Sequence, residues 1–552
     1  MGKIEKKKML FLIFTSFYSY FLFADVIPNI PQLEKELQEP RIKGVVSSRI
    51  EFKNERKIEI KKFKITGNKK VSLSEIEKIT KEYEGKEITV SELKIISDKI
   101  TEIYWNKGYI TSFAYVPPQK IIDGIVEINV IEGKAGKIKI EGNKYYTNTF
   151  IENHFEKVKK EEVLNNRTLE RSLLILNEYP KLNVNVNLTK GEELGLTDLI
   201  INVKEKSYPF NFSIFGNNYG SRYTGRPRVG FTFDLGNLTK HGDVLSLTGI
   251  GNIQDLDSMN YYKIGYTLPL MGTGAKIGVS WSHMKYMIDK ELNPLEVEGK
   301  SDIYSLFLSY PFIRSRFQNL SLFASLNYKD MKNYLFEKTY LNSDDRYSTL
   351  EIGLQRDRLY TNSHLYWTAK ATFGLGTFFG GMSDEEYTNS SRPGLADGTW
   401  IKLNIDVVDI FKIGPTQLIA RLSGQLTTDN LLTGEQMILG GPETVRGYPT
   451  GEYLGDYGYF VSLEWRTPLI PGNFSINKYA NWAFFIDHGS VYKNDILPGE
   501  EKSHKATGVG AGLRIGVPNC FQLRFDAAKR IAGEEPSDKD DWKYWFQAII
   551  SF

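Results

Sequence analysis

Alternation between apolar and polar positions dominates the chain from residue 208 to its end. Short segments of this kind recur between turns rich in Gly, Asn, Asp and Pro, for example 244–248, 303–307 and 521–525. A period of two residues is typical of strands whose two faces meet different environments. The pattern predicts about sixteen strands, at 211–219, 226–234, 242–251, 259–268, 275–285, 300–310, 319–329, 347–357, 363–375, 400–409, 416–426, 457–466, 480–487, 506–515, 519–529 and 543–552.

An even number of strands suits a closed transmembrane barrel, which we expect over 207–552. The last predicted strand ends on the aromatic residue Phe552, as suits a closing strand. The alternative is a soluble β-sandwich or a large soluble β-domain. Such a sheet would have to protect its edges, whereas a closed barrel has none.

Two similar α/β units are predicted ahead of the strands, with a period of about 70–75 residues. The first, 58–133, has a strand at 58–65, a helix with apolar positions at Leu93, Ile96 and Ile100, and strands at 111–116 and 125–131. The second, 134–206, repeats this order: a strand at 137–140, a helical stripe at Leu169, Leu173 and Leu176, and strands at 184–188 and 198–203. We therefore expect α+β units, each with helices on one face of its sheet.

The first 57 residues have the pattern of an export signal and a polar leader. Lysines 3, 6, 7 and 8 precede an apolar run over 9–23 that ends at Ala24, so 1–24 is a predicted signal peptide. An uncleaved anchor is the alternative. In the leader, 25–57, the segment between Pro31 and Pro40 has room for about two helical turns, and the charged stretch 41–57 is a predicted linker.

Composition favours an exported barrel over a nucleic-acid-binding protein. Charged residues make up 25% of the chain and the formal net charge is +3, which gives no case for nucleic acid. Aromatic residues make up 13% and there are 48 glycines, which fits an outer-membrane barrel. The single cysteine, Cys520, excludes an intramolecular disulfide framework.

The longest interval without a predicted strand, about 427–456, holds the most informative motif of the chain. Its sequence is Val445-Arg446-Gly447-Tyr448, just after Gly440-Gly441-Pro442. About forty residues later, Asp487 lies in an apolar strand. Because a guanidinium removed from water needs a carboxylate, we predict that Arg446 and Asp487 pair inside the barrel. The alternative is a surface-turn arginine and an unrelated strand-end aspartate.

Further roles follow from this pairing. Gly447 would allow a tight turn at the tip of the loop, and Tyr448 would pack that tip against the wall. Asp487 itself stands in the apolar run Phe485-Ile486-Asp487-His488-Gly489.

The sequence offers no enzyme chemistry. The six histidines do not pair at metal-ligand spacing, and the glycine-rich stretch 508–512 lies inside a predicted strand. No nucleophile elbow or P-loop appears. We therefore predict a protein without catalytic residues, metal or cofactor.

Short motifs in a fixed order make the chain resemble a known family, the two-partner secretion outer-membrane transporters. This is the haemolysin-activator and filamentous-haemagglutinin transporter group, in the superfamily that also holds the BamA insertases. The motifs are Gly108-Tyr109, Pro117-Pro118-Gln119, Gly124 and Val130–Gly133 in the first unit, Leu173–Asn177, Pro180, Gly191, Gly195 and Thr197-Asp198-Leu199 in the second, and Tyr310–Arg314, Val445–Tyr448, Phe485, Asp487 and Gly489 in the strand region.

The resemblance implies a periplasmic POTRA 1 at 58–133, a periplasmic POTRA 2 at 134–206 and a 16-stranded barrel in the outer membrane. It also implies a plug or linker at 25–57, and a sixth extracellular loop folded back into the pore with Val445–Tyr448 at its tip. Phe485, Asp487 and Gly489 would form the barrel-wall motif that receives this tip. The expected partners are a secreted exoprotein of adhesin or haemolysin type, the outer-membrane lipid, and the barrel-assembly machinery for insertion of the chain itself.

Two alternatives stay open at this point. One is an assembly insertase of the same superfamily, although insertases carry more than two POTRA units. The other is a passive porin or nutrient receptor, although a porin needs no periplasmic α/β units.

Overall fold

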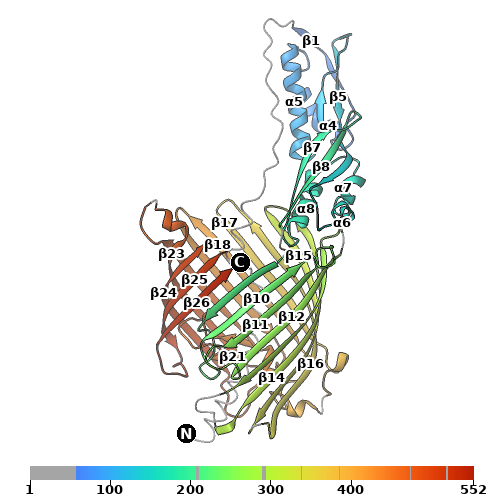
Figure 1. The fold of residues 1–552 in the computed structure, drawn as a ribbon. Coiled ribbons are helices and arrows are strands. Elements are labelled where there is room, and N and C mark those ends of the chain that lie inside the picture. Colours follow the sequence, from blue (N-terminus) through green and yellow to red (C-terminus); the bar gives the residue numbers. More distant parts are fainter. Residues whose placement is uncertain are drawn as a thin grey trace.

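The computed structural model describes residues 57–206, 210–270, 272–288, 294–336, 338–383, 386–472, 474–517 and 520–552. The predicted signal peptide and the segment between Pro31 and Pro40 lie outside the described residues. Two α/β units project from one end of a β-barrel, with the second unit next to the barrel (Figure 1).

Sixteen antiparallel strands form a closed barrel, which confirms the fold predicted from the period of two. Each pairs with its sequence neighbour among the barrel strands, and the last closes against the first, with Gln547 opposite Asn217. The strands are β9 (Phe210–Asn217), β10 (Arg228–Gly236), β11 (Val244–Asn252), β12 (Met259–Leu270), β13 (Ala275–Met287), β14 (Glu298–Arg314), β15 (Gln318–Leu335), β16 (Tyr340–Leu359), β17 (Ser363–Gly374), β18 (Ile401–Ile413), β19 (Thr416–Thr427), β22 (Tyr457–Pro468), β23 (Ala480–Tyr492), β24 (Ser503–Val517), β25 (Phe521–Gly533) and β26 (Trp542–Ser551).

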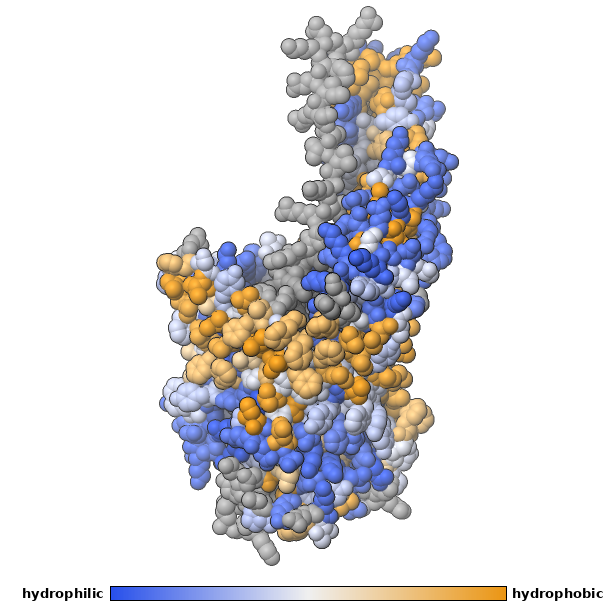
Figure 2. All heavy atoms as spheres, viewed as in Figure 1, coloured by the Kyte–Doolittle hydropathy of each residue, from blue (hydrophilic) through white to orange (hydrophobic). Residues whose placement is uncertain are grey.

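The alternation along each strand separates a lipid-facing surface from the lumen. On β22, the exposed residues Val461, Leu463 and Trp465 alternate with the buried Ser462 and Glu464. On the face seen in Figure 2, hydrophobic residues form a band across the half of the barrel next to the α/β units, and mostly hydrophilic residues cover the other half. Such a band is what a transmembrane barrel presents to the hydrocarbon of the bilayer.

The first α/β unit combines a three-stranded sheet with two helices. Its elements are β1 (Ile58–Ile60), β2 (Lys62–Thr66), α4 (Leu73–Thr80), β3 (Lys86–Ile88), α5 (Val90–Asn106), β4 (Phe113–Tyr115) and β5 (Ile125–Ile131), and the sheet order is β2-β5-β4. The prediction of one strand over 58–65 is wrong. The Gly124 carbonyl accepts from the N–H groups of Lys61 and Lys62, so the chain divides there and β1 pairs with β3 instead.

The second unit repeats the plan of the first. Its elements are β6 (Lys134–Glu141), α6 (Asn148–Asn153), α7 (Glu156–Lys160), α8 (Asn166–Asn177), β7 (Leu182–Lys190) and β8 (Leu196–Glu205), with sheet order β6-β8-β7. The first turn of each unit is built alike: Gly67 and Gly142 have φ of +83° and +92°, and a Cβ there would meet the carbonyl oxygen of Val130 or Val203. The same turn thus occurs twice, which supports a structural repeat.

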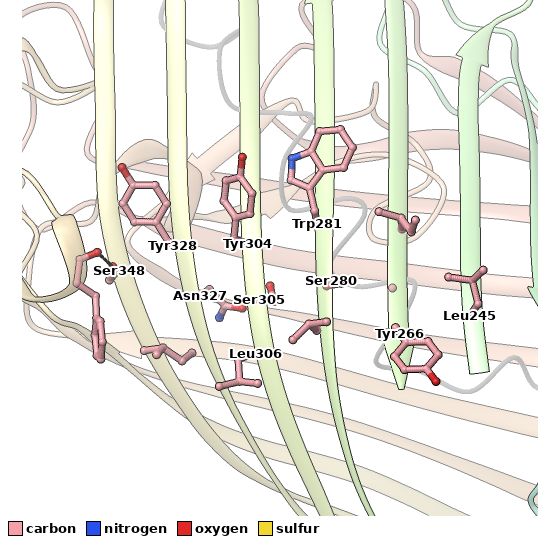
Figure 3. Close-up of a pocket in the computed structure, with 15 residues that line it drawn as sticks. Leu245, Tyr266, Ser280, Trp281, Tyr304, Ser305, Leu306, Asn327, Tyr328 and Ser348 are labelled. Carbon is pink, nitrogen blue, oxygen red and sulfur yellow. Dashed lines mark hydrogen bonds between the residues drawn. The ribbon is translucent and has the colours of Figure 1, made fainter. Parts of the chain in front are cut away.

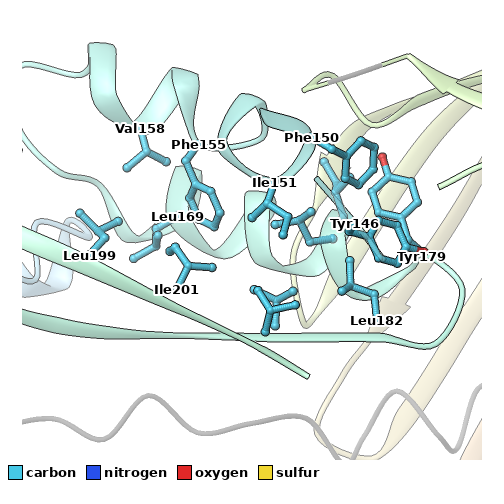
Figure 4. Packing of buried hydrophobic residues seen from close by; sticks show 14 of the residues in the cluster. Tyr146, Phe150, Ile151, Phe155, Val158, Leu169, Tyr179, Leu182, Leu199 and Ile201 are labelled. Atoms are coloured by element: carbon cyan, nitrogen blue, oxygen red, sulfur yellow. The ribbon is translucent and has the colours of Figure 1, made fainter. Parts of the chain in front are cut away.

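Helices and sheet of the second unit enclose one apolar core. Phe150 of α6, Leu169 of α8, and Phe155 between α6 and α7 pack over Leu199 and Ile201 of β8 (Figure 4). Among the described residues of the whole chain, no helix is long and apolar enough to cross a membrane.

Helix α8 and the residue that follows it join the second unit to the barrel. The Arg171 guanidinium donates to the carbonyl oxygens of Pro311 at 2.6 Å and Thr273 at 3.2 Å. Glu178 pairs with Arg314 at 2.6 Å and with Lys276 at 2.9 Å. Burial alone would raise the pKa of Glu178, but the two cations outweigh it and hold that pKa below its usual value.

Candidate functional site

Residues 428–456, between β19 and β22, form a long loop that lies inside the barrel; we call it the lumenal loop. It contains a short hairpin, β20 (Met437–Leu439) and β21 (Tyr453–Gly455). From 431 to 442 every residue of the loop is buried. Figure 1 places β21 within the outline of the barrel. The loop therefore occupies space through which a barrel would otherwise conduct.

Arg446 and Asp487 meet at the tip of this loop. The guanidinium donates from Nε to Oδ2 at 2.7 Å and from Nη2 to Oδ1 at 2.8 Å, a two-pronged contact with the aspartate of β23. The Arg446 backbone N–H donates to the same Oδ2 at 3.2 Å. Asp487 is fully buried and Arg446 is 4% exposed. Two parallel bonds fix the orientation of the arginine as well as its position.

A second carboxylate and an aromatic ring complete the arginine site. Glu464 of β22 accepts from Nη1 of Arg446 at 2.6 Å. The Arg446 Cζ lies 3.2 Å from the centre of the Phe485 ring, so the guanidinium stacks on that ring. Ser462 donates to Asp487 at 2.7 Å and holds the carboxylate in place.

Beyond this site, lumen-facing charges on β22, β24 and β25 continue the network. Glu464 also pairs with Arg466 at 2.8 Å and with Arg514 at 3.0 Å. Asp526 of β25 pairs with Arg514 and with Arg524, each at 2.7 Å. Each of these carboxylates pairs with at least two arginines, so the wall beneath the loop tip is an interlocked set of ion pairs.

Gly447 and Tyr448 place the tip against β24 and β25. A Cβ on Gly447 would stand 3.0 Å from the backbone nitrogen of Arg530, and one on Gly508 would stand 2.9 Å from the Gly447 nitrogen. Glycine on both sides therefore permits this close approach. The Tyr448 hydroxyl donates to the carbonyl oxygens of Ala532 at 2.9 Å and Glu534 at 3.1 Å.

The two remaining motif residues contribute apolar contact. Val445 is buried in a cluster with Leu439, Tyr448 and Tyr453 of the same loop. Gly489 of β23 leaves room for the hairpin, since a Cβ there would stand 2.4 Å from Cδ1 of Leu439.

The base of the lumenal loop has its own anchors. Glu435 pairs with Lys329 at 2.5 Å and with Lys402 at 2.8 Å. Asp456 pairs with the fully buried Arg392 at 2.9 Å. Arg392 belongs to the segment between β17 and β18, so a neighbouring loop also helps to hold the lumenal loop.

The structure brings all seven predicted motif residues to one place, at the contact of the loop tip with the wall. Sequence reasoning missed Glu464, Arg514, Asp526 and Gly508. It also missed a group in which ligand atoms of Glu501, His504 and Glu534 lie within 4.8 Å of one another. His504 Nδ1 already lies 2.6 Å from a carboxylate oxygen of Glu534, and we assign no metal to the group.

Two models of known protein families match this chain. A family model described as haemolysin secretion/activation protein ShlB/FhaC/HecB matches residues 195–515. A second model, a POTRA domain of ShlB type, matches residues 58–133.

Individual relatives are distant but extend over most of the chain. The heme/hemopexin transporter protein HuxB of Haemophilus influenzae (strain 86-028NP) is 24% identical over 554 residues, covering 95% of each chain. The solved structure of CdiB from Escherichia coli has a TM-score of 0.75 at 19% identity and covers 97% of each chain. The fold is also similar to that of BamA from Haemophilus ducreyi lacking POTRA domains 1–3, with a TM-score of 0.53 at 14% identity, covering 90% of this chain and 100% of that one.

Proposed function

The chain belongs to the ShlB/FhaC/HecB family of haemolysin secretion/activation proteins, and on this premise we propose how its parts divide the work of secretion. It is an outer-membrane transporter of a partner exoprotein and not an enzyme. The proposal concerns the finer steps: the two α/β units capture an unfolded exoprotein in the periplasm, the barrel conducts it outward, and the lumenal loop controls the passage.

Capture is supported by the open sheet edges of the α/β units. Among the residues that the structure describes, β4 of the first unit pairs only with β5, and β7 of the second pairs only with β8. An extended chain can add to such an edge through main-chain hydrogen bonds, which tolerate many sequences. The expected occupant of these edges is an exoprotein of adhesin or haemolysin type. The relative HuxB is named as a heme/hemopexin transporter protein.

The observation on which the proposal rests is the Arg446 site. A loop that fills the lumen and is fixed by one arginine between Asp487 and Glu464 can hold the conduit in one state. Every one of these contacts is between loop and wall, and none involves the lipid-facing surface. Weakening the site should therefore change transport without unfolding the barrel.

The test is the substitution Arg446→Ala. It leaves Asp487 and Glu464 buried without the cation that they share. Removing one partner of a buried ion pair destabilises the folded state by about 3–5 kcal/mol. We expect a strong loss of exoprotein from the culture medium, normalised to the amount of heat-modifiable barrel in the outer membrane.

Arg530→Ala is the matched control. Arg530 lies on β25, two strands away from Asp487 on β23, and pairs at 2.9 Å with Asp541, which is half exposed. It should secrete as the unmodified protein does. Normal secretion by Arg446→Ala, or an equal loss in both variants, would refute the role of the site.

A further inference from the structure

The outward wall of β12 to β15 contains an apolar groove of about 660 Å³ (Figure 3). Val279, Leu306 and Leu326 of neighbouring strands face it, and Phe379 of the short 3₁₀ helix η3 (Phe378–Gly380) closes one side. Most of the surface that lines the groove is apolar. A space of this size is within the range of small-molecule and cofactor sites.

An aromatic row borders the groove on the side away from the α/β units. Trp281, Tyr304 and Tyr328 are register neighbours on β13, β14 and β15. The opposite ends of these strands lie near the second α/β unit, since a Cβ on Gly274 would meet the Ile175 side chain. The row therefore marks the outer edge of the apolar band, where aromatic girdles meet the interface.

A basic row follows four residues farther out, about 13 Å along the strands. Lys285 lies opposite Lys300, and Lys300 lies opposite Lys332, all three on the outward face. Their side chains are 27%, 40% and 31% exposed.

Carboxylates also lie near each of these lysines. Glu298, which lies 3.8 Å from Lys285 and 3.7 Å from Lys300, is only 9% exposed. Asp302, between the two rows, accepts from the Trp281 indole N–H at 3.0 Å and lies 3.0 Å from His283 Nδ1. Asp330 lies 3.0 Å from Lys332 and is as exposed as that lysine. Among the three lysines of the row, Lys300 has the most exposed side chain.

We propose that this wall binds a phosphorylated, multiply acylated glycolipid of the outer leaflet, with acyl chains in the groove and phosphate groups on the lysine row. The groove lies within the hydrocarbon band, so its occupant is a lipid and not a soluble anion. The lysines lie where a headgroup would sit. Lys285 and Lys300 lie 3.8 and 3.7 Å from Glu298, which is longer than a hydrogen bond, so both ammonium groups keep donors for phosphate oxygens. This site is independent of the path taken by the exoprotein.

The experiment uses the full-length protein, purified in detergent and delipidated. Native mass spectrometry would follow titration with diphosphoryl hexa-acyl lipid A, with its dephosphorylated form as the comparison. We expect one phosphorylated lipid to be retained, and at least about tenfold weaker binding of the dephosphorylated form, because each basic group at an anionic lipid surface contributes a factor of about five.

Two variants test the two halves of the site. Lys300→Gln with Lys332→Gln should weaken binding by roughly tenfold or more, whereas Lys505→Gln with Lys529→Gln, outward lysines of β24 and β25, should not. Leu306→Trp should fill the groove and displace the lipid. Leu463→Trp, at a similarly exposed position of β22, is its control (Leu306 is 46% exposed and Leu463 50%).

Equal retention of both lipids, or equal loss in the test and control variants, would overturn the proposal. A dimer that disappears in Leu306→Trp would also overturn it, because the groove would then be an interface between two copies. Heat-modifiability on gels establishes that each variant is a folded barrel.

Discussion

The Arg446 guanidinium is recognised on two edges and on one face. Asp487 takes one edge, Glu464 accepts from Nη1, and the Phe485 ring covers the plane. A lysine could satisfy only the charge, because its ammonium has neither the planar fork nor the stacking surface. Since Asp487 is completely buried, it depends on Arg446 for its counter-charge. The two residues should therefore act as a unit.

This coupling can be measured with a double-mutant cycle. Asp487→Ala should reduce secretion about as strongly as Arg446→Ala, because either change breaks the same contact. The double variant should be little worse than either single variant, with an interaction energy of about 0.5–3 kcal/mol. The readout is exoprotein in the medium, normalised to barrel. Strictly additive losses would mean that the residues matter separately.

Some residues of the Arg446 site could be predicted from the sequence and others could not, for a physical reason. Arg446 and Asp487 stand out in the sequence. Arg446 is a cation in a long glycine-rich loop, and Asp487 is a charge within an apolar strand. Glu464 carries no such signal, since polar residues occupy the lumen-facing positions of many strands in a barrel. Only the register between β22 and β23 shows that Glu464 reaches the same guanidinium.

His154 in the second α/β unit provides a pH-dependent prediction. It is 3% exposed and bonded at 2.8 Å to the Phe150 carbonyl and at 2.9 Å to the Tyr179 hydroxyl. Burial lowers its pKa below the usual value. The unfolded unit therefore takes up a proton below about pH 6.5 that the folded unit resists, and stability is lost as the pH falls. Proteolysis of this unit in the full-length protein should be faster at pH 5.5 than at 7.5.

The variant His154→Gln is the control for that measurement. It removes the titrating group, so the difference in proteolysis between the two pH values should shrink. An unchanged pH dependence in His154→Gln would assign the effect to other groups.

Strands and helices differ in how far they could be predicted. All sixteen barrel strands were expected because lipid on one side and a polar lumen on the other force a period of two on each. Helices α4, α6 and α7, of 8, 6 and 5 residues, were not separately predicted. So short a helix displays too few turns for its apolar face to repeat, and its stability comes from tertiary packing.

The contact between α8 and the barrel can be tested at Glu178. This carboxylate is shared by Lys276 and Arg314 on two different barrel strands. Glu178→Ala would leave two cations at the rim without their anion, and hydrogen exchange in α8 should increase. Glu192→Ala is the control, because Glu192 pairs with Lys137 on the exposed surface of the same unit. Unchanged exchange in Glu178→Ala would show that apolar packing holds the junction alone.

The barrel and the α/β units have separate sources of stability. Every barrel strand is paired on both sides. Each α/β unit has an apolar core of buried residues from its own chain segment. The link between the bodies includes polar contacts from Arg171 and Glu178 and the packing of Phe150 against His241. Each body should therefore fold without the other, although secretion needs both.

Deletion of residues 58–206 tests this division directly. The truncated chain keeps all sixteen barrel strands and the Arg446 site, so it should insert as a heat-modifiable barrel. Exoprotein secretion should be abolished, because the sheet edges at β4 and β7 that we propose for capture are gone.

Deleting 58–133 alone separates the two units: it removes β4 but keeps β7 and the contacts of α8 with the barrel. Exoprotein in the medium and in the periplasm would be measured together, since a capture defect leaves it in the periplasm. Normal export by the larger deletion would refute capture by these units, whereas loss of the barrel itself would refute the independence of the two bodies.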